Sequence, residues 1–149
     1  MGKGLGFTLI ELMVTIAVLA IIATMAAPSF RNIALAQNFN RSTQQLVSQL
    51  NQARSKAVLE RKEMTVDLSK TEQTPDTKTT LYWKPAGDAV LKSGSPTEIT
   101  FLLSGGVKDF DANIKNKPFV ICNKSGGDKS KSIDISLMGT VNITESSTC

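Results

Sequence analysis

An unbroken apolar stretch near the N-terminus limits what this chain can fold into more than any other feature of the sequence. Residues 7–27 read FTLIELMVTIAVLAIIATMAA, in which Glu11 is the only ionisable side chain. As a helix, a stretch of about 21 residues rises roughly 30 Å, which matches the hydrocarbon core of a bilayer. We therefore expect a transmembrane helix over residues 7–27.

The residues before this stretch predict its orientation and its processing. The sequence MGKGLG carries one positive charge, on Lys3, and ends in Gly6 directly before the apolar run. A secretory signal has the opposite order, with the apolar run before the cleavage site, so cleavage after Gly6 would leave the helix on the mature protein. Positive charge favours the cytoplasmic side of a membrane. We therefore expect residues 28–149 to lie outside the cytoplasm.

A second helical pattern follows Pro28. Residues suited to burial recur at steps of three and four: Phe39, Thr43, Leu46, Leu50, Ala53 and Ala57. Polar and charged residues lie between them, which is typical of an amphipathic helix with one buried face. The pattern predicts a helix over residues 28–61, with a kink at Pro28 because proline removes a backbone hydrogen bond.

Residues 62–149 have the composition of a β-rich domain. Short alternating runs rich in Thr, Val and Ile predict strands at 64–68, 79–84, 98–103, 118–123, 132–137 and 140–144. The last two strands flank Met138 and Gly139, which we expect to form a two-residue hairpin turn with positive φ at the glycine. The expected fold is α+β, with a long N-terminal helix, half transmembrane and half amphipathic, whose second half packs on an antiparallel sheet.

The sequence contains no histidine, the commonest general base and the commonest metal ligand. Ser-His-Asp and Cys-His catalysis are therefore excluded, and we expect a protein that is not an enzyme and has no metal and no cofactor. A net charge of +4 is too small to indicate a nucleic-acid binder without clustering of the basic residues.

The two cysteines, Cys122 and Cys149, show neither CxxC spacing nor the company of zinc ligands. We expect them to form a disulfide, which would tie down the C-terminus and indicate an oxidising compartment. The alternative is a pair of unconnected thiols.

The segment GFTLIE, from Gly6 to Glu11, resembles the processing site of type IV prepilins and pseudopilins. The resemblance implies that residues 1–6 are a leader peptide, that prepilin peptidase cleaves after Gly6, and that Phe7 becomes the N-methylated first residue. Pro28 also lies where many pilins carry a helix-kinking proline.

The same resemblance implies an assembly role for Glu11, which would meet the N-terminal amine of Phe7 in a neighbouring subunit. A carboxylate in the apolar core of a membrane costs about 2.5–3.5 kcal/mol on insertion scales. The presence of Glu11 there therefore calls for a group that pairs with its charge or for a functional role. The alternative is a side chain that reaches the membrane interface, because Glu11 lies near the start of the helix.

Three features downstream are similar to the GspH/FimT/FimU group of minor pilins and pseudopilins: the segment LVSQLNQARSKAVLERKEMTVDL, Trp83, and the late hairpin SIDISLMGTVNI. The resemblance implies a single-pass inner-membrane protein with a periplasmic domain that later joins a pilus or pseudopilus. Its partners would be major and minor pilins and prepilin peptidase. The C-terminal cysteine pair favours a minor pilin that primes or joins a type IV pilus, and the alternative is a minor pseudopilin of type II secretion.

A pilus-borne DNA-binding subunit is a further alternative, because some FimT-like minor pilins capture DNA with basic residues near a glycine-arginine motif in the last hairpin. Here Gly139 is followed by Thr140, Val141 and Asn142, so the arginines are missing. Candidate phosphate contacts are instead five lysines, namely Lys115, Lys117, Lys124, Lys129 and Lys131. The competing interpretation is an ordinary solvated surface, since no arginine or aromatic residue lies among them to stack on bases.

Overall fold

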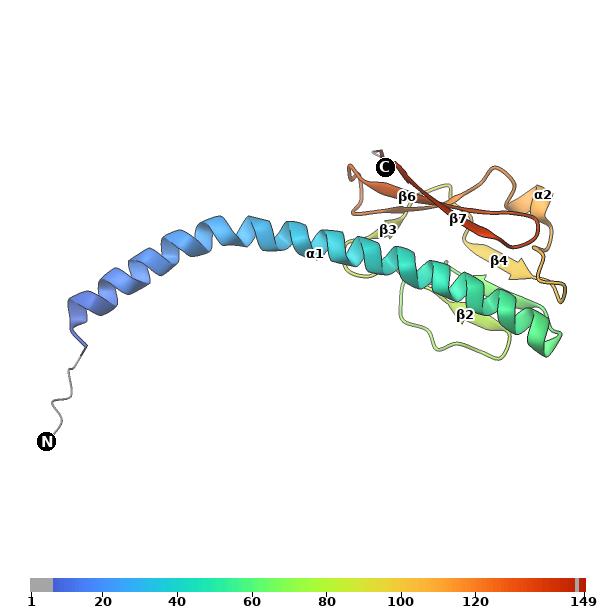
Figure 1. The fold of residues 1–149 in the computed structure, drawn as a ribbon, viewed down its shortest axis with the longest axis horizontal. Coiled ribbons are helices and arrows are strands. Elements are labelled where there is room, and N and C mark those ends of the chain that lie inside the picture. The colour runs from blue at the N-terminus through green and yellow to red at the C-terminus, as the bar shows by residue number, and fades with distance from the viewer. Residues whose placement is uncertain (1–6, 147) are drawn as a thin grey trace, which may run out of the picture. The chain divides into compact units, whose positions relative to one another are not determined.

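The computed structural model describes residues 7–146 and 148–149, apart from the side chains of residues 26–28. The chain divides into two compact units, an N-terminal segment that ends at Ala34 and a C-terminal domain, Leu35–Cys149. One helix, α1 (Leu9–Glu60), contributes to both units (Figure 1). The helix predicted over residues 28–61 thus ends within one residue of the expected position.

Both ends of α1 have recognisable caps. At the start, Thr8 accepts the Leu12 amide with its carbonyl oxygen at 3.2 Å and the Glu11 amide with its hydroxyl at 3.3 Å. At the end, Arg61 has φ 50°, and the Lys62 amide donates to the Ala57 carbonyl at 3.2 Å. This is the Schellman arrangement, here with arginine at the left-handed position that glycine usually takes.

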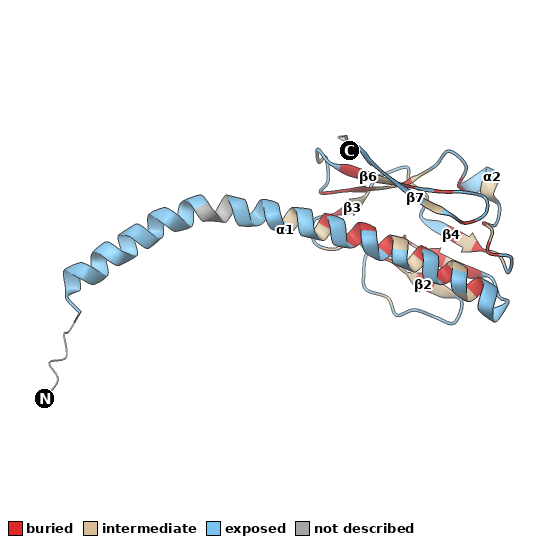
Figure 2. Ribbon diagram, in the orientation of Figure 1, coloured by how far each residue is buried: buried red, intermediate tan, exposed pale blue. Residues whose placement is uncertain are grey.

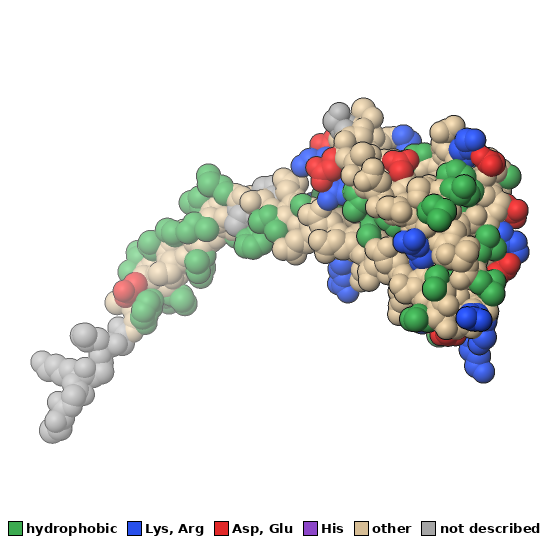
Figure 3. All heavy atoms as spheres, turned by 45° about the vertical axis from the view of Figure 1, so that its right-hand side comes forward, with side chains coloured by type: hydrophobic (Ala, Val, Ile, Leu, Met, Phe, Trp, Pro, Cys, Tyr) green, Lys and Arg blue, Asp and Glu red, His purple; other side chains and the backbone are tan. Residues whose placement is uncertain are grey.

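The N-terminal segment exposes large apolar side chains along its length. They are Phe7, Leu9, Ile10, Leu12, Met13, Val14, Ile16, Val18, Leu19, Ile21, Ile22, Met25, Phe30 and Ile33. In Figure 3 green side chains line this part of the helix. Among the described residues, no single helix meets the length and hydropathy criteria for a membrane span, whereas Leu9–Met25 and Ser29–Glu60 meet them as a pair.

The C-terminal domain contains two sheets and a short helix, α2 (Phe110–Asn113). The first sheet has the order β2-β1-β4, with bounds Thr80–Tyr82, Met64–Asp67 and Glu98–Phe101. The second has the order β3-β5-β6-β7, with bounds Val90–Leu91, Phe119–Cys122, Ser130–Ile135 and Val141–Ser146. The α+β class is confirmed, and the helix packs on both sheets through one core.

Two details of the expected sheet were wrong. The strands form two sheets, and β1 and β2 run parallel, with Thr65 opposite Thr80. The polar segment 68–79 between them is long enough to bring the chain back to the start of β1, which a parallel pairing requires. The short elements β3 and α2 were not predicted, because two to four residues carry too little periodicity to recognise.

The last hairpin also differs from the expected two-residue turn. Ser136 and Thr140 close it, with the Ser136 amide donating to the Thr140 carbonyl at 3.0 Å, so the loop comprises residues 137–139. Gly139 has φ 75°, as expected, and a Cβ there would lie 2.5 Å from the Gly105 carbonyl oxygen. Glycine is therefore required for the backbone conformation and for the close approach of the two loops.

The buried face of α1 is the predicted one. Phe39, Thr43, Leu46, Leu50, Ala53 and Ala57 are all buried, as Figure 2 shows by the red positions along this half of the helix. Trp83 fixes the end of the first sheet to the helix, because its indole Nε1 donates to the Ser42 carbonyl at 3.2 Å. The hydroxyl of Ser42 in turn accepts the Ala86 amide at 2.8 Å, so no polar atom of this contact is left without a partner.

Candidate functional site

The predicted processing and assembly residues lie at the beginning of α1. Gly6 is outside the described residues, and Phe7 is exposed just before the helix. Glu11 lies in the first turn with its side chain exposed and its amide bound by Thr8. Pro28 lies within the bounds of α1, but its side chain is outside the described residues, so the predicted kink stays a prediction.

The position of Glu11 has a local explanation that the sequence reasoning missed. Thr8 is the N-cap, which makes Glu11 the third residue of the helix, and the sequence TLIE has the spacing of a capping box. A carboxylate near a helix N-terminus is stabilised by about 0.3–1 kcal/mol through the unpaired amides and the helix dipole. This stabilisation acts within the single chain, before any neighbouring subunit contributes.

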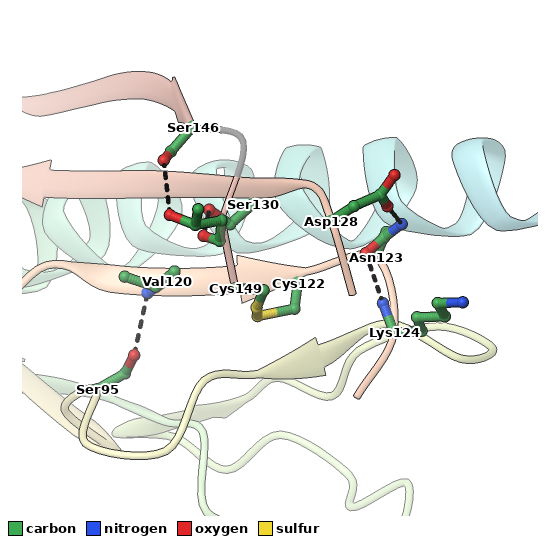
Figure 4. Close-up of a disulfide and its surroundings, with 10 residues drawn as sticks. Ser95, Val120, Cys122, Asn123, Lys124, Asp128, Ser130, Ser146 and Cys149 are labelled. Atoms are coloured by element: carbon green, nitrogen blue, oxygen red, sulfur yellow. Dashed lines mark hydrogen bonds between the residues drawn. A yellow bond between two sulfur atoms is a disulfide. The ribbon is translucent and has the colours of Figure 1, made fainter. Parts of the chain in front are cut away.

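Cys122 and Cys149 form a disulfide, as predicted, with their Cα atoms 5.8 Å apart. Cys122 is the buried last residue of β5, and the bond ties the end of the chain to it (Figure 4). The same end is held by Ser130 in β6, whose hydroxyl donates to the Thr148 carbonyl at 2.6 Å. The chain beyond β7 is thus attached to two other strands of its sheet.

A polar network orders the loop between β5 and β6. The Asn123 side chain donates to Asp128 at 2.9 Å and accepts the Lys124 amide at 3.0 Å (Figure 4). The hydrogen bond from Asn123 lowers the pKa of Asp128, and the nearby charges of Lys129 and Lys124 act in the same direction. This network was not predicted, because nothing in the sequence distinguishes Asn123 from an ordinary surface residue.

The five candidate lysines do not form one surface. Lys115 pairs with Asp111 at 2.8 Å in the α2 region, which raises the pKa of Lys115, and Lys117 donates to the Ala112 carbonyl at 2.9 Å. Lys124 and Lys129 are exposed on the β5–β6 loop.

The fifth lysine, Lys131, is engaged within the fold. Its side chain is only 18% exposed, and its Nζ lies 3.1 Å from Glu145, 2.9 Å from the Asn40 side chain and 5.4 Å from the Phe39 ring centre. These contacts connect α1, β6 and β7. Lys131 therefore stabilises the packing of the sheet on the helix, which makes it a poor candidate for a phosphate contact.

An exposed apolar end of the domain was not predicted. The Arg54 guanidinium binds the Gly105 carbonyl at 3.1 Å, and the Val107 amide binds the Leu137 carbonyl at 3.0 Å, so α1 and two loops meet here. The exposed apolar residues on these segments are Val58, Leu59, Leu103, Leu137 and Met138. Exposed apolar residues from neighbouring segments are typical of a contact surface.

The described residues contain no group of three or more Cys, Asp or Glu side chains arranged to hold a metal ion. The described residues instead contain a helix with an N-terminal cap and exposed apolar side chains, a sheet to which the disulfide ties the end of the chain, and an exposed apolar end of the domain. Of these features, the exposed apolar surfaces of the helix and of the domain end are suited to contacts with other molecules.

Two family models match the chain. Residues 1–27 match the prokaryotic N-terminal methylation motif, and residues 42–139 match the family described as type II transport protein GspH. No curated protein and no solved structure gives a significant match. Proteins of these two families are structural subunits, processed by prepilin peptidase and assembled with other pilins, and not enzymes. Since the second match alone covers well over half of the sequence, the chain belongs to the GspH family of type IV pilins and pseudopilins.

Proposed function

We propose that this chain is a minor subunit of a type IV pilus, which takes part in starting or extending the filament. The observation that carries the proposal is the exposure of large apolar side chains along residues 7–33, next to a domain whose own apolar core is complete. Exposed apolar surface on this scale needs a membrane or neighbouring subunits to cover it. Lipid would cover these side chains while the subunit is in the inner membrane, and neighbouring subunits would cover them in the filament.

Glu11 would set the position of the subunit in the filament. Its carboxylate is exposed in the first helical turn, so the methylated amine of Phe7 in a neighbouring subunit can approach it. Such an ion pair offsets the cost of a charge in apolar surroundings, and its short reach fixes the axial position of one helix against the next. Cleavage after Gly6 is the step that creates this amine.

The choice of a pilus over a secretion system rests on the disulfide between Cys122 and Cys149. A filament that extends from the cell surface is exposed to conditions in which a covalent tie at the chain end is an advantage. The second candidate, a minor pseudopilin of type II secretion, is supported by the description of the family that matches residues 42–139. DNA binding has weaker support, because the candidate lysines are divided between the α2 region, the β5–β6 loop and β6, and Lys115 and Lys131 are ion-paired.

Deletion of the gene with complementation by the full chain tests this proposal. We expect the deletion to reduce surface piliation and twitching, to leave secretion of exoproteins intact, and to be rescued by the wild-type chain. Loss of secretion with normal twitching would contradict the pilus assignment and favour the pseudopilin. Rescue by Glu11→Ala at wild-type levels would contradict the role of the carboxylate. The matched control is Glu11→Asp, which keeps the charge.

A further inference from the structure

The strand β7 forms an open edge of the four-stranded sheet. Its only neighbour among the described strands is β6, with Ile143 opposite Ile133 and Val141 opposite Ile135. Five of its six residues are exposed, and Figure 2 shows most of the strand in pale blue. An exposed strand of this length at a sheet edge is a template on which another strand can pair.

The hydrogen-bonding pattern identifies which backbone groups of β7 face outward. In an antiparallel pair, alternate residues exchange hydrogen bonds with their partner, and the residues between them direct their N–H and C=O groups away from it. The bond between Ser136 and Thr140 sets this alternation, so Asn142, Thr144 and Ser146 bond to β6. The outward-facing residues are Val141, Ile143 and Glu145, and within the described chain their backbone groups have no partner outside the strand pairing.

The other edge strands either have outward backbone groups that are bound or partly covered within the chain, or are very short. In β2, every outward backbone group is bound within the chain: the Thr80 amide by the Thr77 hydroxyl, the Thr80 carbonyl by the Thr77 amide, the Tyr82 amide by Asp76 and the Tyr82 carbonyl by Gln49. The outer edge of β4 is partly covered by residues 106–108, and β3 has only two residues. Among the described strands, β7 is thus the long edge that the chain itself leaves uncovered.

The sequence of β7 also lacks the devices that usually prevent edge pairing. VNITES contains neither proline nor lysine, and the charge of Glu145 is paired with Lys131 at 3.1 Å. The disulfide and the Ser130–Thr148 hydrogen bond hold the chain just beyond the strand. The edge is therefore ordered before any partner arrives, which lowers the entropy cost of binding.

We infer that the free edge of β7 binds an extended segment of another pilin subunit, which adds a fifth strand to this sheet. Outward N–H and C=O groups on every second residue match the hydrogen-bonding pattern of another extended backbone, which would replace the water around them, and the exposed side chain of Ile143 provides an apolar contact beside it. Subunits stacked in a filament meet through unlike surfaces, which favours a segment of a different subunit over a second copy of β7. That the partner is a pilin rests on the proposed function.

The substitution Ile143→Pro in the full chain tests the backbone contact. Proline at 143 removes an outward N–H and leaves the hydrogen bonds to β6 in place, so the domain should still fold, as edge strands accept such prolines. We expect incorporation into sheared filaments to fall roughly tenfold, the equivalent of a loss of about 1.4 kcal/mol. Formation of the Cys122–Cys149 disulfide on non-reducing gels serves as the check of folding.

The matched control is Ile143→Thr, which keeps the N–H and the β-branched shape, and should incorporate nearly as well as the wild type. Normal incorporation of a folded Ile143→Pro chain would overturn the inference. Equal loss with Ile143→Thr would also overturn it, because the side chain and not the backbone would then carry the contact.

Site-specific photocrosslinking identifies the partner independently of pilus function. A benzophenone amino acid at Thr144 on β7 should form an adduct with another pilin or pseudopilin in whole cells, and this adduct should disappear when Ile143→Pro is added. The same probe at Lys78, on the loop that covers β2, should give no such adduct. An adduct with a second copy only, equal adducts at both positions, or none at Thr144 would overturn the inference. An adduct with a pseudopilin would support the edge contact and contradict the assignment to a pilus.

Discussion

The two halves of α1 differ in whether the chain itself buries their apolar side chains. Between Leu9 and Ile33 the large apolar residues are exposed, whereas from Phe39 to Ala57 a single buried stripe packs on the domain's own sheets. One continuous helix thus contains a part whose large apolar side chains are exposed in the single chain and a part whose apolar side chains are buried by its own domain. Position along α1, and not residue type alone, should therefore decide whether a substitution affects folding or assembly.

The largest effect should come from the same substitution made in each half. Leu50→Ala removes a fully buried side chain and should lower the free energy of unfolding by about 2–5 kcal/mol. Leu19→Ala, at an exposed position, should change it by less than about 0.5 kcal/mol. The emission of Trp83, the only tryptophan in the chain, reports unfolding of the domain in detergent-solubilised protein. Equal losses in the two variants would refute the comparison.

Removal of the disulfide should have the next largest effect, confined to the C-terminal domain. Cys149→Ser opens a loop that spans 27 residues and should cost about 3 kcal/mol of stability in the chain-entropy model. Denaturant titration of the variant should agree with the wild type under a reducing agent, which serves as the control. A loss below about 1 kcal/mol would mean that Ser130 and the β6–β7 pairing hold the chain end without it.

A smaller gain is expected where α1 ends. Arg61 has φ 50°, a conformation that costs a residue with a side chain roughly 1 kcal/mol relative to glycine. Arg61→Gly should therefore raise the stability of the domain by about 0.5–1 kcal/mol in the same titration. Arg61→Ala removes the same charge without the conformational benefit and should give no gain. If alanine stabilised as much as glycine, the effect would belong to the charge and not to the helix end.

The smallest effect should be the pH dependence of the β5–β6 loop. The hydrogen bond from Asn123 holds the pKa of Asp128 below its ordinary value of 3.8. A lowered pKa in the folded state means that this stabilisation is complete above the unfolded-state pKa and is lost as the pH falls through the folded one. Denaturation midpoints between pH 7 and pH 2 should thus fall less in Asp128→Asn than in the wild type. Superimposable pH profiles would contradict this.

Much of the fold could be predicted because its signals are local. The stripe on α1 follows from spacing, and each of the six expected strands overlaps an observed strand, as in Met64–Asp67 and Phe119–Cys122. The disulfide followed from the absence of any other role for two cysteines. The parallel pairing of β1 with β2 could not be predicted, because the direction of a strand depends on the path of the long loop before it.

The candidate site was predictable only in part. The first residues of α1 carry a motif that can be read from the sequence, and the family match to residues 1–27 supports it. The open edge of β7 could not be recognised, because an edge is defined by strand order, and VNITES would read the same in the middle of a sheet. The lysines illustrate a second limit of sequence analysis, since neighbours in sequence such as Lys129 and Lys131 have unlike surroundings in the fold.

The bond between Cys122 and Cys149 also has a mechanical consequence. A hairpin whose last strand ends freely can be peeled open from that end, one hydrogen bond at a time, when force acts on the strand. Here the end of the chain is joined to β5, two strands away from β7, so a pull on β7 is shared across the sheet. The strand can resist tension as part of a closed loop, which would suit the pilus subunit proposed above.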